Sequence, residues 1–240
     1  MSMSNKQRSW LMVPANKADA IAQAATSGAD VVVLDLVEFV RDEHKPAARE
    51  KMRAALDAVR AGGAQVYAQI DPQQPEADLR ACVWPGLSGI VVSRAESAAQ
   101  IAAIDQYLFL LEKERGIPAG ANGLVLSLET ARGNQDAYAI ATASQRVRAL
   151  TLGRADLAMD LRPEPSGEIH QMPYLMERLI IIARAIGATP LGAWWRAPDR
   201  GLLSTAENTL QAAKRGRAVG FKGALCLRAD QIEPLNKMYV

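Results

Sequence analysis

Acidic side chains follow several short apolar segments of this sequence, each close to the point where the segment ends. The set is Asp35, Glu38, Asp71, Glu129 and Asp156. Neither of the two histidines falls at such a position, which disfavours a Ser-His-Asp triad and a histidine-rich zinc site. Carboxylate oxygens instead suit a hard cation, and Mg²⁺ takes one or two of them together with water and substrate. Glu129 and Asp156 follow consecutive segments and are the best-placed pair for such an ion.

A structural role is the alternative for these carboxylates. They could cap helices, or pair with the arginines that lie near the same segment ends, Arg94, Arg132 and Arg154. Position along the chain does not separate this role from metal binding.

The segments that would position these groups alternate with alanine-rich amphipathic stretches. Several of the segments are apolar at consecutive positions, which is typical of strands buried on both faces of a parallel sheet. Eight strands are predicted: Ser9–Val13, Val31–Leu36, Gln65–Ile70, Gly89–Val92, Leu124–Leu128, Val147–Leu152, Pro190–Ala193 and Ala224–Leu227. Apolar residues between them step by three and four, as in Ile101, Ile104, Leu108 and Leu111, and therefore predict helices.

Eight strand–helix repeats in 240 residues match the size and order of a (β/α)8 barrel. A doubly wound open sheet fits the same alternation, but it usually has fewer strands and no glycine-rich fingerprint follows the first one. No linker divides the chain, so residues 1–240 are expected to form one domain. In a barrel the carboxyl ends of all strands meet at one face, where the carboxylates would share a site.

The composition is that of an ordinary soluble protein, with 49% hydrophobic and 22% charged residues. A net charge of +2 argues for neither a nucleic-acid nor a membrane partner. The apolar runs fall far short of the roughly 20 residues of a membrane span, and the first residues are polar. Cys82 and Cys226 form no paired motif. We expect a cytoplasmic protein that acts on a small molecule.

Six motifs occur in an order that is specific to one family. They are Arg8–Asn16, Ala29–Leu36, Lys45 with Ala47–Arg49, Glu129–Gly133, Leu152-Gly153 with Asp156-Leu157, and Gly220-Phe221 with Gln231-Ile232. In this order they resemble the citrate lyase β-subunit-like branch of the HpcH/HpaI aldolase family. The resemblance implies a (β/α)8 barrel, usually a homotrimer, that uses Mg²⁺ to cleave or form a carbon–carbon bond beside a carbonyl. The implied substrates are acyl-CoA thioesters of malyl or citramalyl type, or a carrier-protein equivalent.

The resemblance also implies roles for individual residues. The two metal-binding carboxylates of the family fall on Glu129 and Asp156, and the metal would hold an α-oxo acid and polarise its carbonyl. The enolate left by cleavage needs positive charge or hydrogen-bond donors nearby. Lys17 matches a basic position near which the family places CoA phosphates, although a solvated lysine at the start of a helix fits as well.

The acidic motif after the second strand departs from the family pattern. Where the family has DLEDAV, this chain has Asp35-Leu36-Val37-Glu38-Phe39-Val40. One acid is therefore replaced by Val37 and another is lengthened to Glu38, which is a predicted catalytic residue.

Further departures affect charged positions. Gln69 stands where the family has an arginine that binds the substrate carboxylate, and an amide makes no charged bidentate pair. Ser93-Arg94 replaces Pro-Lys, and Arg228-Ala229 replaces His-Pro. We predict that Gln69 and Arg94 contact the substrate and that Arg228 is catalytic. Any of Arg94, Arg132 and Arg228 could replace the arginine that the family has at position 69. The alternative for Arg228 is a surface arginine without a role in the site. Trp194 and Trp195 could line the pocket or pack under a helix.

The sequence therefore favours a Mg²⁺-dependent carbon–carbon lyase that acts on a hydroxyacyl thioester and releases an α-oxo acid. A catalytically degenerate relative with a binding or regulatory role is the first alternative. The second is a pyruvate-type aldolase acting on a free hydroxy-oxo acid. The chain ends at Val240, whereas longer relatives continue into helices that cover a neighbouring subunit's site, so we expect a barrel without that lid.

Overall fold

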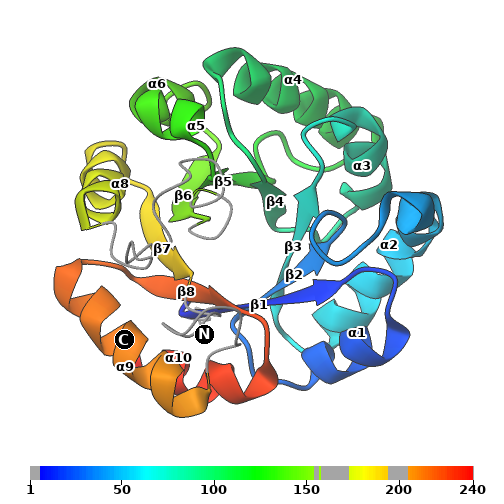
Figure 1. Cartoon of the computed structure of the whole chain (residues 1–240). Coiled ribbons are helices and arrows are strands. Elements are labelled where there is room, and N and C mark those ends of the chain that lie inside the picture. Colours follow the sequence, from blue (N-terminus) through cyan, green and yellow to red (C-terminus); the bar gives the residue numbers. More distant parts are fainter. Residues whose placement is uncertain (1–5, 154–156, 158–172, 194–204, 240) are drawn as a thin grey trace.

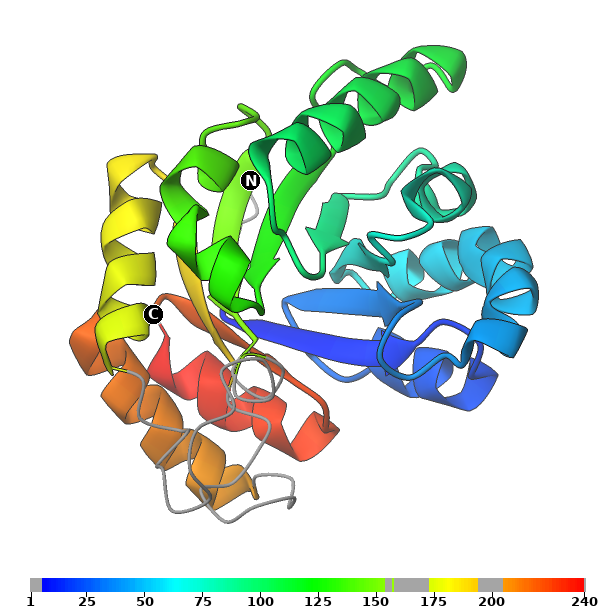
Figure 2. The same cartoon turned by 45° about the horizontal axis from the view of Figure 1, so that its top comes forward.

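Eight parallel strands close into a barrel in the order β1 to β8, with helices around the outside (Figures 1 and 2). The computed structural model describes residues 6–153, 157, 173–193 and 205–239. β1 pairs with both β2 and β8, which closes the sheet and rules out the doubly wound open alternative. The predicted (β/α)8 barrel is confirmed.

Each predicted strand is present, and its ends differ from the prediction by at most one residue. The strands are β1 Ser9–Pro14, β2 Val31–Asp35, β3 Gln65–Ile70, β4 Gly89–Val92, β5 Gly123–Leu128, β6 Val147–Leu152, β7 Thr189–Ala193 and β8 Gly223–Cys226.

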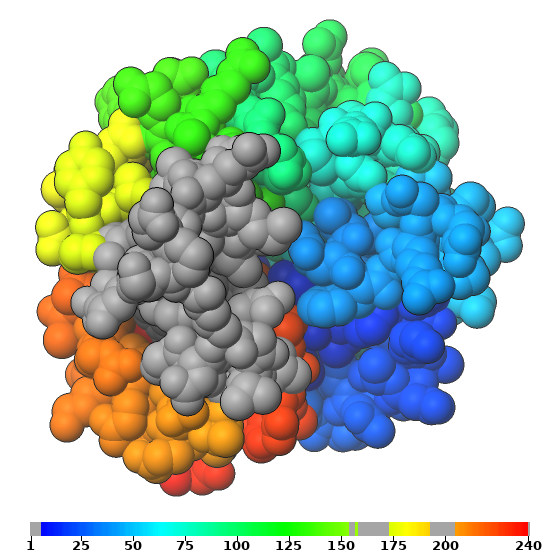
Figure 3. Space-filling model, in the orientation of Figure 1, coloured from blue at the N-terminus to red at the C-terminus, as the bar shows by residue number. Residues whose placement is uncertain are grey.

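Helices follow the strands in chain order. In the space-filling view the sequence colours accordingly succeed one another around the molecule (Figure 3). They are α1 Ala18–Ala25, α2 Lys45–Ala61, α3 Pro75–Cys82, α4 Ala98–Glu114, α5 Ala131–Gln135, α6 Ala137–Ala141, α8 Pro173–Ala185, α9 Ala206–Val219 and α10 Ile232–Met238. Short 3₁₀ turns, Asp42–His44 and Ala229–Gln231, precede α2 and α10. In the described parts of the chain, no helix is long and apolar enough to cross a bilayer.

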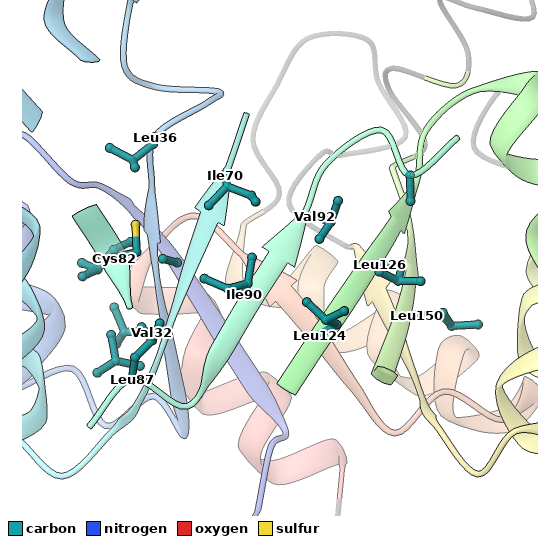
Figure 4. Close-up of a cluster of buried hydrophobic side chains, with 14 of the residues drawn as sticks. Val32, Leu36, Ile70, Cys82, Leu87, Ile90, Val92, Leu124, Leu126 and Leu150 are labelled. Carbon is teal, nitrogen blue, oxygen red and sulfur yellow. The ribbon is translucent and has the colours of Figure 1, made fainter. Parts of the chain in front are cut away.

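The hydrophobic core has two layers because successive side chains of a strand point to opposite faces. One set fills the barrel: Trp10, Met12, Val31, Val33, Tyr67, Val91, Val125, Ala149, Leu191 and Leu225. The alternate residues lie between strands and helices, where Ile70, Ile90, Val92, Leu124 and Leu126 form part of a larger cluster (Figure 4). The two sets of core residues define the inward-facing and outward-facing positions of each strand, and so identify the residues at the strand ends that face the barrel interior.

An irregularity interrupts the pairing of β5 with β6. Leu124 pairs with Val147, but the next pair is Val125 with Ala149, so Arg148 is an extra residue on β6. Val147 belongs to the outer layer and Ala149 to the barrel interior, and regular pairing then continues to Leu128 and Leu152.

A buried ion pair joins α4 to the start of β6. The guanidinium of Arg146 lies 2.7 Å from both carboxylate oxygens of Glu112, and it also contacts Asp105. Glu112 accepts further hydrogen bonds from the backbone N–H groups of Gly120 and Asn122, at 2.9 and 3.0 Å. The loop before β5 is therefore tied to α4 through one carboxylate.

Candidate active site

Polar side chains occupy the interior positions at the carboxyl ends of β2 to β6. The alternation that places Val33, Tyr67, Val91, Val125 and Ala149 inside the barrel continues into a polar layer above them. That layer consists of Asp35, Gln69, Ser93, Ser127, Glu129 and Thr151, all buried. Of the residues that the sequence places at the strand ends, this layer brings together Asp35, Gln69, Ser93 and Glu129.

Glu129 is held in one orientation by its neighbours. Its Oε2 accepts a hydrogen bond from the backbone N–H of Arg94 at 2.9 Å. Its side chain also lies over Gly153 at the end of β6, where a Cβ atom would come 2.3 Å from Glu129 Cγ. Glycine at 153 is therefore what leaves room for the carboxylate.

Arg94 contributes its backbone to this arrangement. Its φ of 45° is the one left-handed conformation at a non-glycine residue within the described ranges, and it aims the N–H at Glu129. The guanidinium lies 3.3 Å from Glu96 on a side chain that is about half exposed. The substrate contact predicted for this side chain stays a prediction, while the backbone role was not foreseen.

One further polar group of this layer is the hydroxyl of Thr151 on β6, the strand that pairs with the strand before Glu129. Thr151 Oγ1 is buried two residues before Gly153 and has no hydrogen-bond partner among the described residues. A buried hydroxyl is costly to leave unpaired, so a ligand oxygen or cation there would compensate it. The described residues hold no cluster of three metal-binding side chains. Asp156, the second predicted ligand, lies outside the described residues.

Gln69 and Ser93 form a neutral pair on adjacent strands. Gln69 Nε2 donates to Ser93 Oγ at 3.1 Å, and that hydroxyl donates to the carbonyl of Ile70 at 3.3 Å. Ser93 and Arg94 are consecutive, so the same strand end contacts Gln69 on one side and Glu129 on the other.

Asp35 organises the loop after β2. Its carboxylate accepts hydrogen bonds from the backbone N–H groups of Val37, Glu38 and Phe39 at 2.7–3.1 Å. Burial raises the pKa of Asp35, although these hydrogen bonds oppose the shift. A carboxylate used this way shapes the loop that carries Glu38.

Lys45 connects the loops after β2 and β3. Its buried ammonium lies 2.7 Å from Asp71 and 2.8 Å from Asp42. Burial favours the neutral amine, but the two carboxylates outweigh it and raise the pKa of Lys45. Asp71 is thus part of an ion-pair network, as the structural alternative holds.

The remaining candidates lie at the periphery. Lys17 precedes α1 and is exposed, and Glu38 is exposed on the loop after β2. Arg228 is exposed, and its guanidinium contacts Asp230, which is two residues away. Trp194 and Trp195 lie outside the described residues.

Sequence reasoning missed two polar groups at these strand ends. Thr151 is inside a predicted strand, two residues before Gly153, so strict alternation would have placed it inside the barrel. Asn16, after β1, has a buried side-chain oxygen with no partner among the described residues. Both residues are uncharged, whereas the sequence prediction of the site was based mainly on carboxylates and arginines.

Comparison with known proteins identifies the family to which the chain is similar. Residues 8–229 match the model of the HpcH/HpaI aldolase/citrate lyase family. Citrate lyase subunit beta of Leuconostoc mesenteroides subsp. cremoris is 26% identical over 242 residues, which cover 100% of this chain and 78% of that protein. A citrate lyase subunit beta-like protein of Deinococcus radiodurans is 30% identical over 232 residues, with 94% and 77% covered.

A solved structure of similar sequence shares the fold over its full length. The citrate lyase beta subunit of M. tuberculosis, complexed with oxaloacetate and magnesium, superposes with a TM-score of 0.75 at 26% identity. The match covers 100% of this chain and 99% of that one. With a family match over most of its length and the same barrel, this chain belongs to the HpcH/HpaI aldolase/citrate lyase family.

Proposed function

We propose that the protein is a Mg²⁺-dependent carbon–carbon lyase that cleaves a hydroxyacyl thioester of malyl, citramalyl or citryl type and releases an α-oxo acid. The observation that carries the proposal is the buried Glu129, held by the Arg94 N–H and by the space at Gly153, with the hydroxyl of Thr151 on the neighbouring strand unpaired among the described residues. Membership of a family of aldolases and citrate lyases supports the reaction class.

Glu129 and Asp156 are the proposed metal ligands. A bound Mg²⁺ would polarise the carbonyl of the α-oxo acid and neutralise its carboxylate. The M. tuberculosis relative that binds oxaloacetate and magnesium supports this choice of ion and ligand class. The hydrogen bond from Arg94 restrains Glu129, so this carboxylate would be oriented before the ion binds.

Cleavage requires a base and a stabilised enolate. The substrate hydroxyl loses its proton to a base, the carbon–carbon bond breaks as the oxo acid's carbonyl forms, and the electron pair becomes a thioester enolate, which then takes up a proton. Glu38 is the proposed base because its loop is shaped by Asp35 at the end of β2. Arg228 is the proposed cation that stabilises the enolate. In this role its guanidinium would leave Asp230 and contact the substrate.

Lys17 and the outer helices complete the proposal. The exposed ammonium of Lys17 follows β1 and is available to CoA phosphates.

Helix α4 contacts α6, and α6 contacts α8. These three helices carry exposed apolar side chains: Phe109, Leu110, Tyr138, Tyr174 and Ile181. A homotrimer would give this surface a partner.

A metal titration of the purified protein tests the proposal. Mn²⁺, which is visible by EPR and replaces Mg²⁺, should bind saturably, and its affinity should rise when pyruvate or glyoxylate is present. Thioester cleavage, followed as release of the oxo acid, should require the metal.

Other results would favour the alternatives. If Mn²⁺ binds in neither condition, the carboxylates are structural, and a degenerate protein with a binding or regulatory role becomes the better description. If a free hydroxy-oxo acid is cleaved and CoA does not compete, the protein is a pyruvate-type aldolase.

Replacing Gly153 with alanine should weaken Mn²⁺ binding about 10- to 100-fold. The new Cβ would displace Glu129 Cγ, which lies 2.3 Å from its position. Because a side chain rather than backbone must move, the melting temperature should change little. Unchanged metal affinity in a folded Gly153→Ala protein would show that Glu129 does not bind the ion.

A further inference from the structure

We propose that Lys45 is a positioning residue for Glu38: its buried ammonium fixes the loop that carries Glu38 by joining the end of that loop to the neighbouring loop after β3. The inference rests on the proposed function, because it concerns how the proposed base of the same site is held. It follows from a network of charged side chains that connects α2, α3 and the two loops.

The loop between β2 and α2 is held firmly at its start. Asp35, the last residue of β2, accepts hydrogen bonds from three consecutive backbone N–H groups, and the second of them is that of Glu38. Val40 is 3% exposed and packs into the core. A short 3₁₀ turn then leads into α2 at Lys45. Glu38 therefore lies between an anchor at Asp35 and the contacts that hold the end of the loop.

Lys45 supplies the contacts at the end of the loop. The residue is 5% exposed, and its Nζ lies 2.7 Å from Asp71 and 2.8 Å from Asp42. The contact with Asp71 is the stronger, because the side chain of Asp71 is 14% exposed and that of Asp42 is 91% exposed. Asp71 directly follows β3, so the ammonium joins two neighbouring loops at the face where the strands end.

Asp71 offers Lys45 a partner that is itself held in place. Its backbone N–H donates to Asp78 on α3 at 2.7 Å, and its second carboxylate oxygen accepts the N–H of Gln73 at 2.9 Å. Asp78 is fully buried and also accepts a hydrogen bond from Arg49 Nε at 2.7 Å. Lys45 and Arg49 are four residues apart on one face of α2. The network therefore runs from α2 to the loop after β3 and back to α2.

Helix stability does not explain a lysine at position 45. Lys45 is the first residue of α2, where the helix dipole disfavours a positive charge. Replacing a buried ion pair by uncharged residues of similar size is often neutral or stabilising, so the pair with Asp71 is not needed for the fold. An uncharged pair, however, does not fix the distance between the two loops as an ammonium between carboxylates does.

Hydrogen–deuterium exchange of the full chain, followed by mass spectrometry without ligand, tests the structural step. In Lys45→Met the amide hydrogens of residues 36–44 should exchange at least about tenfold faster than in the wild type, because the loop can open from its free end. The double variant Lys45→Met/Asp71→Asn should behave in the same way. It leaves no buried charge without a partner, so it also serves if Lys45→Met alone does not fold.

Kinetics test the functional step. With whichever of malyl-CoA, citramalyl-CoA and citryl-CoA the wild type cleaves, kcat of both variants should fall about 10- to 100-fold, as expected for a displaced base. Mn²⁺ affinity should stay within about twofold, which a general loss of structure would not allow. Lys51→Met, at an exposed lysine of the same helix, is the matched control and should change neither exchange nor kcat.

The outcomes separate this inference from the lyase proposal. Exchange as slow in the folded variants as in the wild type overturns the role of Lys45, whether or not the protein is a lyase. Faster exchange with an unchanged kcat overturns it as well and leaves the lyase proposal standing. If the wild type cleaves none of the three thioesters, the proposed function fails, and the positioning of Glu38 as a base falls with it.

Discussion

Changing Glu129 to glutamine should abolish Mn²⁺ binding and thioester cleavage together, with a loss of more than about 100-fold in metal affinity. Glutamine has the same shape, and its carbonyl oxygen can still accept the hydrogen bond from the Arg94 N–H, so the fold should be retained. What disappears is the negative charge that holds the cation. EPR titration measures the first effect, and release of the oxo acid measures the second.

Glu96→Gln is the matched control for this change. Glu96 lies in the same loop region and pairs with the Arg94 guanidinium, on a side chain that is about one-third exposed. Removing its charge should leave Mn²⁺ affinity within about twofold, as expected for a partly exposed pair. Retention of full cleavage activity by Glu129→Gln would contradict the metal-dependent mechanism.

Glu112→Ala should destabilise the protein by about 3–5 kcal/mol, the largest stability effect expected from a single polar residue here. The change leaves Arg146 buried without its bidentate partner and takes the acceptor away from the N–H groups of Gly120 and Asn122. Urea unfolding measures the loss. Glu114→Ala, on the same helix but at an exposed pair with Arg80, should cost less than about 1 kcal/mol.

The same pair should make stability depend on pH. Burial alone would raise the pKa of Glu112, but hydrogen bonds from Arg146, Asn122 and Gly120 outweigh it and lower the pKa. Its contribution is therefore complete above the ordinary glutamate pKa of about 4.3 and is lost as the pH falls through the lowered value. Glu112→Gln should flatten the acid side of the stability curve; an unchanged slope would contradict this assignment.

The fold was predictable because the barrel repeats one simple pattern. Both ends of strand β3, Gln65–Ile70, were predicted correctly. The strand is buried on both faces, so its sequence is a continuous run of apolar and amide residues between turn residues. Leu36 and Leu227 were included in strands β2 and β8 but lie just beyond them. Hydrophobicity marks where a strand is buried, whereas pairing with its neighbours decides where it ends.

The site was only partly predictable. Strand order placed Glu129 at the carboxyl-end face of the barrel, where the structure also has it, and so marked it as a candidate ligand. The sequence did not show that Arg94 acts through its backbone or that Asp71 is held by Lys45, because both depend on loop conformations. The sequence also did not show that Arg94 pairs with Glu96 and Arg228 with Asp230, while the substrate contacts of both arginines stay predictions.

The extra residue at the base of β6 has a consequence for how this barrel tolerates change in length. Side chains of a strand alternate between its two faces, so a one-residue shift in the register of β6 would turn Gly153 outward. Leu152 would then take its place beneath Glu129. The irregularity at Arg148 absorbs the extra residue three positions before Thr151, the site's first polar group on that strand, and the pairing above it is regular. A residue can therefore be gained or lost at this point while the upper rim keeps the same atoms facing the barrel interior.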